Sequence, residues 1–126
     1  MATINVKVTR AGVSAVENPQ TAKQTETVTW VFTFIDTASD NLRVVFKKVE
    51  LPNNSGALLI YEQGPFSSPL SMIGGQISGT IAPDAPDGRY LYDIHDGNDK
   101  FLDWVTKLSP DQNFGGLDVP KSPPGG

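Results

Sequence analysis

The chain of 126 residues contains no cysteine, and this absence excludes a wide range of chemistry. Without a thiol there is no disulfide, no thiolate metal site, no iron–sulfur cluster and no cysteine nucleophile. Histidine is nearly absent as well, because His95 is the single one in the chain. Any site that requires two or more imidazoles is therefore excluded by the residues available.

Long apolar runs are also missing. No segment approaches the ~18 consecutive apolar residues typical of a membrane-spanning helix. The first residues, Met-Ala-Thr-Ile-Asn-Val-Lys-Val, have neither the basic region nor the apolar region of a secretion signal. We therefore expect no membrane association and, by default, a cytoplasmic location. A secreted chain that has lost its signal would look the same, so that alternative stays open.

Positive charge is scarce. The chain has 10 lysines and arginines against 14 aspartates and glutamates, which gives a net charge of −4. The excess of acid lies in residues 51–126, whereas residues 1–50 are close to balance. An acidic chain without a basic stripe repels a phosphate backbone, so we do not expect nucleic acid as a partner. Cations, basic proteins and neutral ligands remain compatible with this charge.

Glycine and proline, in contrast, are abundant, with 12 and 10 residues. Because 38% of the chain is hydrophobic, it is too apolar for a disordered protein, and these residues belong to turns. Many turns favour many short strands over long helices. The length suits one domain, which we predict at residues 1–119, followed by a Pro/Gly-rich tail at 120–126.

Alternating apolar and polar residues predict the strands. In 3–9 the residues Ile4, Val6 and Val8 share one face, and 26–35 is the strongest strand of the chain. Further strands are predicted at 42–49, 57–61, 77–82, 89–96 and 100–106, with a short edge strand at 117–119; 17–25 reads as a connector and 62–75 as a long loop. This pattern predicts an all-β fold, a seven- to eight-stranded antiparallel Greek-key β-sandwich.

Three segments resemble known sandwich families. Asp84-Ala-Pro-Asp-Gly-Arg-Tyr-Leu-Tyr resembles the turn and strand of immunoglobulin-like and cupredoxin-like domains. Val28-Thr-Trp-Val-Phe followed by Leu42-Arg-Val-Val-Phe is similar to the cupredoxin pattern, and Gly-Gly-Leu-Asp-Val at 115–119 resembles the final strand of such domains. The immunoglobulin resemblance implies that Tyr90 forms a tyrosine corner, in which the hydroxyl bonds to upstream backbone.

The resemblance concerns architecture only. A blue copper site needs two imidazoles and a thiolate, and this chain has one histidine and no cysteine. The copper ligands of a cupredoxin are therefore absent, and we expect no cofactor.

Polar residues gather at the end of the strand predicted at 89–96. Carboxylate and amide oxygens suit a cation, so Asp93, Asp96, Asn98 and Asp99 are a weak candidate site for calcium. Their spacing does not fit an EF-hand, in which the glycine comes sixth and an acid twelfth. A tight hairpin turn requires the same residue types, because Gly and Asn tolerate positive φ. Both interpretations remain open.

Aromatic residues offer a second weak candidate. Tyr61, His95 and Trp104 could contact a ligand such as a sugar, whereas Trp30, Tyr90 and Tyr92 fall in the apolar phase of their strands and are predicted to be core. Catalysis by His95 would require a nucleophile, and no Gly-x-Ser-x-Gly motif is present near the loop serines. We predict that the protein is not an enzyme.

These observations favour a non-catalytic binding or structural module that acts through protein–protein contacts. The partner would be another protein or a second copy of the chain, reached through an exposed sheet edge or the loop 62–75. The alternative is a carbohydrate- or calcium-binding module that uses the hairpin end at 93–99.

Overall fold

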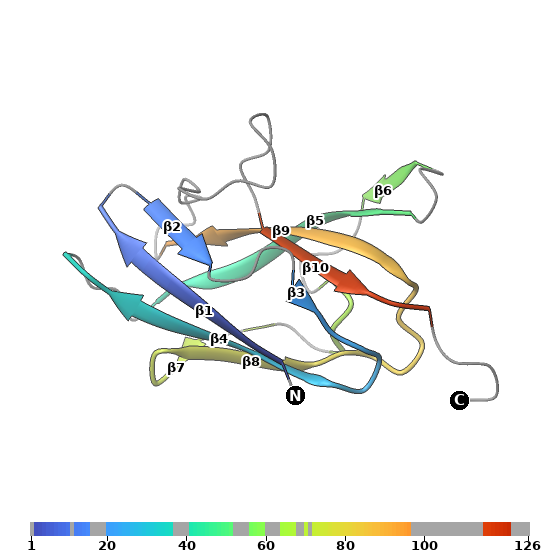
Figure 1. The fold of residues 1–126 in the computed structure, drawn as a ribbon, viewed down its shortest axis with the longest axis horizontal. Helices are drawn as coiled ribbons and strands as arrows, with labels where there is room; N and C mark the ends of the chain where they lie inside the picture. Colours follow the sequence, from blue (N-terminus) through green and yellow to red (C-terminus); the bar gives the residue numbers. More distant parts are fainter. Residues whose placement is uncertain are drawn as a thin grey trace.

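A computed structural model describes residues 2–10, 12–15, 20–36, 41–51, 56–59, 64–67, 70, 72–96 and 115–121. Within these ranges the chain forms ten strands and no helix. The strands make two five-stranded sheets that form the two layers of a sandwich (Figure 1). The prediction of an all-β sandwich is confirmed. None of the described residues forms a helix that could cross a membrane.

The first sheet, sheet A, has the strand order β2-β1-β4-β8-β7. Its strands are β2 (Gly12–Ala15), β1 (Ala2–Thr9), β4 (Thr27–Phe34), β8 (Gln76–Thr80) and β7 (Met72–Ile73). In β1 every second side chain is buried, from Ala2 to Val8, and the residues between them are exposed or half-buried. This alternation follows from the pleat of a strand that packs on one side, as the sequence predicts.

The second sheet, sheet B, has the order β3-β10-β9-β5-β6. Its strands are β3 (Gln20–Thr21), β10 (Gly115–Val119), β9 (Gly88–His95), β5 (Arg43–Glu50) and β6 (Ala57–Leu59). The register between β5 and β9 shifts at Lys47, which forms a β-bulge between Phe46 and Lys48. A bulge places two residues opposite one and bends the strand locally.

Two strand pairs are parallel, which differs from a purely antiparallel sandwich. β1 pairs with β4 in parallel, and β3 pairs with β10 in parallel. After the β1–β2 hairpin the chain pairs with sheet B through β3 before it enters sheet A again at β4 (Figure 1). This crossing between sheets lets β4 run in the same direction as β1. The described residues form ten strands instead of the predicted seven or eight, because β2, β3 and β7 are too short to show a period-2 pattern in the sequence.

Two other predictions are corrected by the sheet order. The connector predicted at 17–25 contains β3, which binds the edge of β10. The strand predicted at 117–119 is longer, and it lies inside sheet B, between β3 and β9, instead of at an edge. The predicted strand 100–106 lies outside the described residues. Over residues 89–92, β9 is paired by β5 on one side and by β10 on the other.

The core is centred on aromatic rings from both sheets. The Trp30 ring lies 5.6 Å from that of Tyr92 and 5.7 Å from that of Phe66, measured between centroids. Phe46 packs 5.3 Å from Tyr92 and 5.8 Å from Phe66. Trp30, Tyr90 and Tyr92 are almost fully buried, so their prediction as core residues is confirmed.

The described part of the loop 62–75 covers this core. Phe66 is buried and forms an isolated bridge with Ile81, and the Ala82 amide donates to the Pro65 carbonyl at 2.9 Å. Gly79 makes this packing possible, because a Cβ there would lie 2.4 Å from Leu70 Cδ2 and 2.7 Å from Phe66 Cδ1. Part of the loop is therefore a packed cover of the sandwich.

Candidate functional site

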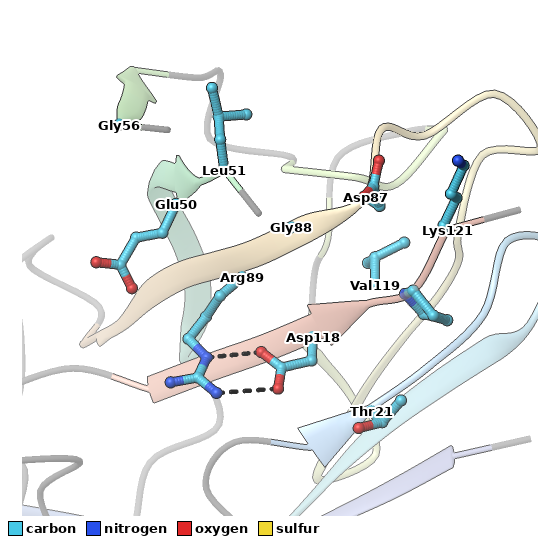
Figure 2. Close-up of a pocket in the computed structure, with 11 residues that line it drawn as sticks. Thr21, Glu50, Leu51, Gly56, Asp87, Gly88, Arg89, Asp118, Val119 and Lys121 are labelled. Carbon is cyan, nitrogen blue, oxygen red and sulfur yellow. Dashed lines mark hydrogen bonds and ion pairs between the residues drawn. The ribbon is translucent and has the colours of Figure 1, made fainter. Parts of the chain in front are cut away.

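A cleft of about 810 Å³ opens at one end of sheet B. Its walls come from the end of β5, the start of β9, the end of β10 and the strand β3 (Figure 2). The residues that line it are Thr21, Glu50, Leu51, Gly56, Asp87, Gly88, Arg89, Asp118, Val119, Pro120 and Lys121. Volumes of this size are typical of ligand sites, although the walls here are more charged than is usual.

The floor of the cleft is a row of side chains in register across four strands. Glu50 pairs with Arg89, Arg89 pairs with Asp118, and Asp118 pairs with Thr21. Each of the four has at least one buried neighbour along the chain and is itself half-buried or exposed, so these side chains point outward from sheet B. The strand register therefore places one arginine between two carboxylates.

Arg89 and Asp118 form a bidentate ion pair (Figure 2). Arg89 Nε donates to Asp118 Oδ1 at 2.7 Å, and Nη2 donates to Oδ2 at 3.1 Å. The hydrogen bonds that Arg89 donates to Asp118 raise the pKa of Arg89, and the negative charge of Glu50 adds to this effect. A guanidinium has five N–H donors, so Asp118 leaves three that meet no acceptor among the described residues and can bind a ligand.

Hydrogen bonds fix the turn that forms one wall of the cleft. The Tyr90 hydroxyl donates to the Pro86 carbonyl at 2.6 Å, which confirms the predicted tyrosine corner. Burial raises the pKa of Tyr90 to about 12, and the charge of Asp87 contributes to the same shift. Gln24 Nε2 donates to the Ala85 carbonyl at 3.1 Å and to the Pro120 carbonyl at 2.9 Å. The Gln24 side-chain amide thus connects the turn to the residue that follows β10.

Gly88 allows β9 to start this close to β5. Its φ is +150°, and a Cβ there would lie 2.7 Å from Val49 Cγ2 and 2.8 Å from the Glu50 carbonyl oxygen. Only glycine fits a backbone conformation of this kind at such a distance. The Asp-Gly pair that the sequence marks as a turn is therefore also part of the cleft wall.

Of the site residues predicted from sequence, Asp93, His95 and Asp96 are described, and they lie at the opposite end of β9. Asp93 is buried on the outer side of sheet B, where Lys47 Nζ lies 2.7 Å from its Oδ2 atom. Its Oδ1 atom is also buried and accepts no hydrogen bond within the described part of the chain. Asp93 is thus already neutralised by a lysine. A cation at this carboxylate would have to displace the lysine.

The structure brings some of the predicted residues together. His95 stands two residues after Asp93 on the same side of β9, and it pairs in register with Arg43 of β5. Asp96 follows directly, whereas Asn98, Asp99, Tyr61 and Trp104 lie outside the described residues. Across the described ranges, no three His, Asp or Glu side chains are grouped as a metal site would require. The hairpin-end site stays a prediction, and Lys47 and Arg43 give it a basic surrounding.

Sequence reasoning did not find the cleft. Glu50, Arg89 and Asp118 are separated by 29 to 68 positions along the chain, and only the register of β5, β9 and β10 brings them together. The one local signal was the turn at Asp84–Gly88, where two aspartates and one proline precede Arg89. That signal indicated a turn and gave no reason to look for a site there.

No protein-family model matches this sequence, and no curated protein matches it. Among solved structures, the chain is similar to a mutant of amicyanin in its reduced Cu(I) form at pH 4. The identity is 17%, the TM-score is 0.41, and the alignment covers 95% of this chain and 84% of that chain. Similarity at this level assigns neither a family nor a function to this chain.

Proposed function

We propose that this chain is a non-catalytic binding module that holds a charged segment of a protein partner in the cleft at the end of sheet B. The observation that carries the proposal is the row Glu50, Arg89 and Asp118, fixed in register on three neighbouring strands beside a cleft. Strands and hydrogen-bonded turns hold these groups, so little conformational freedom is lost on binding.

The charges of the cleft indicate the chemistry of the partner segment. Glu50 and Asp87 carry negative charge and make no hydrogen bond or ion pair with the described residues, and Lys121 is a positive counterpart at the rim. Arg89 contributes its remaining donors. A segment that carries both a basic and an acidic side chain would satisfy all of these groups. A ligand with charge of one sign would leave like charges opposed.

The sheet edges offer less for a partner. The edge strands of the two sheets are β2, β7, β3 and β6, and each has four residues or fewer. Short edges are a known way to prevent strand-to-strand association, because they present few unpaired backbone groups. Contact through the cleft is therefore favoured over the exposed sheet edge that the sequence suggested.

Charge reversal at the rim tests the proposal. The wild-type chain captures partners from a cell extract, the proteins are identified by mass spectrometry, and the strongest is purified for calorimetric titration. The cleft variant carries Asp87→Lys and Lys121→Glu, and the control is Lys7→Glu on the exposed face of sheet A. We expect the cleft variant to weaken the dissociation constant about tenfold or more, and the control to change it less than about twofold.

Three outcomes would count against the proposal, provided that circular dichroism shows all variants folded. The first is that the control reduces the affinity for the purified partner as much as the cleft variant does. The second is an affinity that the cleft variant leaves intact. The third is a folded wild-type chain that captures no protein above background.

A further inference from the structure

The outer face of sheet A is formed mostly by uncharged polar side chains, chiefly hydroxyls, although the exposed apolar Ile73 of β7 lies in register with Gln76 at its edge. It comprises Thr3, Asn5, Lys7 and Thr9 from β1, Ser14 from β2, Thr27, Thr29, Val31 and Thr33 from β4, and Gln76, Ser78 and Thr80 from β8. We call these residues the hydroxyl face. Lys7 is the only charged residue among them, although 19% of the chain is charged.

The residues of the hydroxyl face lie in rows across the strands. One row is Thr3, Thr29 and Ser78, and the next is Asn5, Val31 and Gln76. Thr29 and Ser78 share a hydrogen bond of 2.7 Å between their hydroxyls, and Thr27 and Thr80 share one of 3.2 Å. Each of these hydroxyls keeps further lone pairs for an outside ligand.

The shape and size of this face narrow its possible occupants. An outward strand face has no cavity for a small ligand to enter, and the described cleft belongs to the other sheet. Four strands about 4.8 Å apart, of the lengths seen here, span on the order of 500 Å². A stable pair of proteins buries roughly 800 Å² per partner, so a second copy on this face would be held weakly.

We propose that the hydroxyl face binds a strand of uncharged polysaccharide. Side chains that donate and accept hydrogen bonds match the hydroxyls of sugars, and the methyl groups of the threonines contact the C–H faces of the rings. An extended polymer reaches several rows at once, so many weak contacts act together. Threonine is stiff at χ1, which limits the side-chain entropy lost on binding. This site is independent of the cleft on sheet B.

Sedimentation with insoluble polysaccharides tests the inference. The probes are microcrystalline cellulose, chitin and insoluble starch, and the bound fraction is measured by depletion of protein from the supernatant. The test variant carries Thr29→Lys and Ser78→Glu, which places an opposite-charge pair across two strands and keeps the net charge unchanged. A second variant, Gln76→Lys, changes one exposed residue at the start of β8. The control is Lys121→Glu in the cleft.

We expect the wild-type chain and the control to bind at least one probe equally. The paired variant should weaken this binding about tenfold, and Gln76→Lys should weaken it less. Raising NaCl to about 0.5 M should leave wild-type binding unchanged, because an uncharged contact is not screened.

The inference is overturned if the wild-type chain binds none of the three probes, or if the folded paired variant binds as well as wild type. It is also overturned if the control abolishes binding, since the site would then be the cleft. Two further results would show that another partner occupies the face. One is a dimer in solution that the paired variant dissociates. The other is a freezing point that wild type lowers although it binds none of the probes.

Discussion

Both sheets present an outward face of strand side chains, and the two faces differ in charge. On sheet A, rows such as Thr3, Thr29 and Ser78 are uncharged and exposed or half-buried. On sheet B, outward-facing side chains form ion pairs, namely Lys47 with Asp93 and Arg89 with Asp118. The difference matters for recognition, because charged groups act over longer distances and respond to salt, whereas hydroxyls act only on contact.

Burial separates the two faces as well. The outward residues of β1 are exposed or half-buried, but in β9 both Leu91 and Asp93 point outward and are buried. Sheet A therefore carries one solvated face, and the middle of sheet B is buried on both sides. A buried charge on sheet B requires a partner, as at Asp93. The charged side chains around the cleft are open to solvent.

The largest expected effect compares two of the glycines that allow close packing. Gly88→Ala on sheet B should reduce the free energy of unfolding by about 2–4 kcal/mol, since its Cβ would meet the Glu50 carbonyl at a positive φ. Gly79→Ala on sheet A should cost about 1–2 kcal/mol, because its Cβ would meet the side chains of Leu70 and Phe66 instead of backbone atoms. Urea denaturation measures both. A larger loss for Gly79→Ala than for Gly88→Ala would show that the cleft wall is less constrained than the packing of the loop 62–75 on the core.

The second comparison uses two lysines on outward strand positions. Lys47→Met should destabilise the protein by about 1–3 kcal/mol, because Asp93 would keep a buried charge without its partner. Lys7→Met should change stability by less than about 0.5 kcal/mol, since Lys7 has no partner among the described residues. Thermal unfolding of both variants checks this, and equal effects would mean that the buried pair does not stabilise sheet B.

The third comparison concerns one hydroxyl on each sheet. Tyr90→Phe removes the bond to the Pro86 carbonyl and should cost about 1–2 kcal/mol. Thr29→Val removes an exposed bond to Ser78 and should cost less than about 0.5 kcal/mol. Chemical denaturation at neutral pH separates them. A larger loss for Thr29→Val would make the hydroxyl face a structural element of sheet A.

Tyr90 and Tyr92 also predict an alkaline limit to stability. Burial raises the pKa of each to about 12, above the value of 10 in the unfolded chain. Between these values the unfolded state loses protons that the folded state keeps, so stability falls as pH rises from 10 to 12. Stability should be unaffected by these groups below pH 10. Tyr90→Phe should reduce the slope of this loss, and an unchanged slope would argue against a buried hydroxyl at position 90.

The smallest expected effect is the coupling between Arg89 and Asp118. The pair is half exposed, so a double-mutant cycle with alanine should give about 0.5–1 kcal/mol, and about 1 M NaCl should reduce it. The same cycle between Thr29 and Ser78 should give a coupling that salt does not change. A salt-independent value for Arg89 and Asp118 would contradict the view that this pair is open to the solvent of the cleft.

The sequence predicted the elements with clear alternation and missed those defined by long-range pairing. The strands β1 and β4 follow from period-2 burial, and Tyr90 at the corner follows from a local turn motif. The parallel pairing of β1 with β4 depends on a crossing of the chain between sheets, which leaves no local pattern. Interior placement of β10 was missed for the same reason, since a proline follows it as it would follow an edge strand.

The candidate sites show the same limit. The aspartates and the histidine around residue 95 attracted a functional interpretation because they are adjacent in sequence, and Asp93 proves to be paired with Lys47. The cleft was invisible because its charges come from three strands that are far apart along the chain. Register, which sequence patterns do not specify between distant strands, decides where such a site forms.

The most direct test of the cleft as the protein-binding site is a titration of the purified partner into the isotope-labelled chain, followed by amide chemical shifts. We predict shifts at Thr21, Glu50, Arg89 and Lys121, with the amides of β1 and β4 unchanged. Shifts confined to sheet A, or to the end of β9 at His95, with none around Arg89, would contradict this assignment.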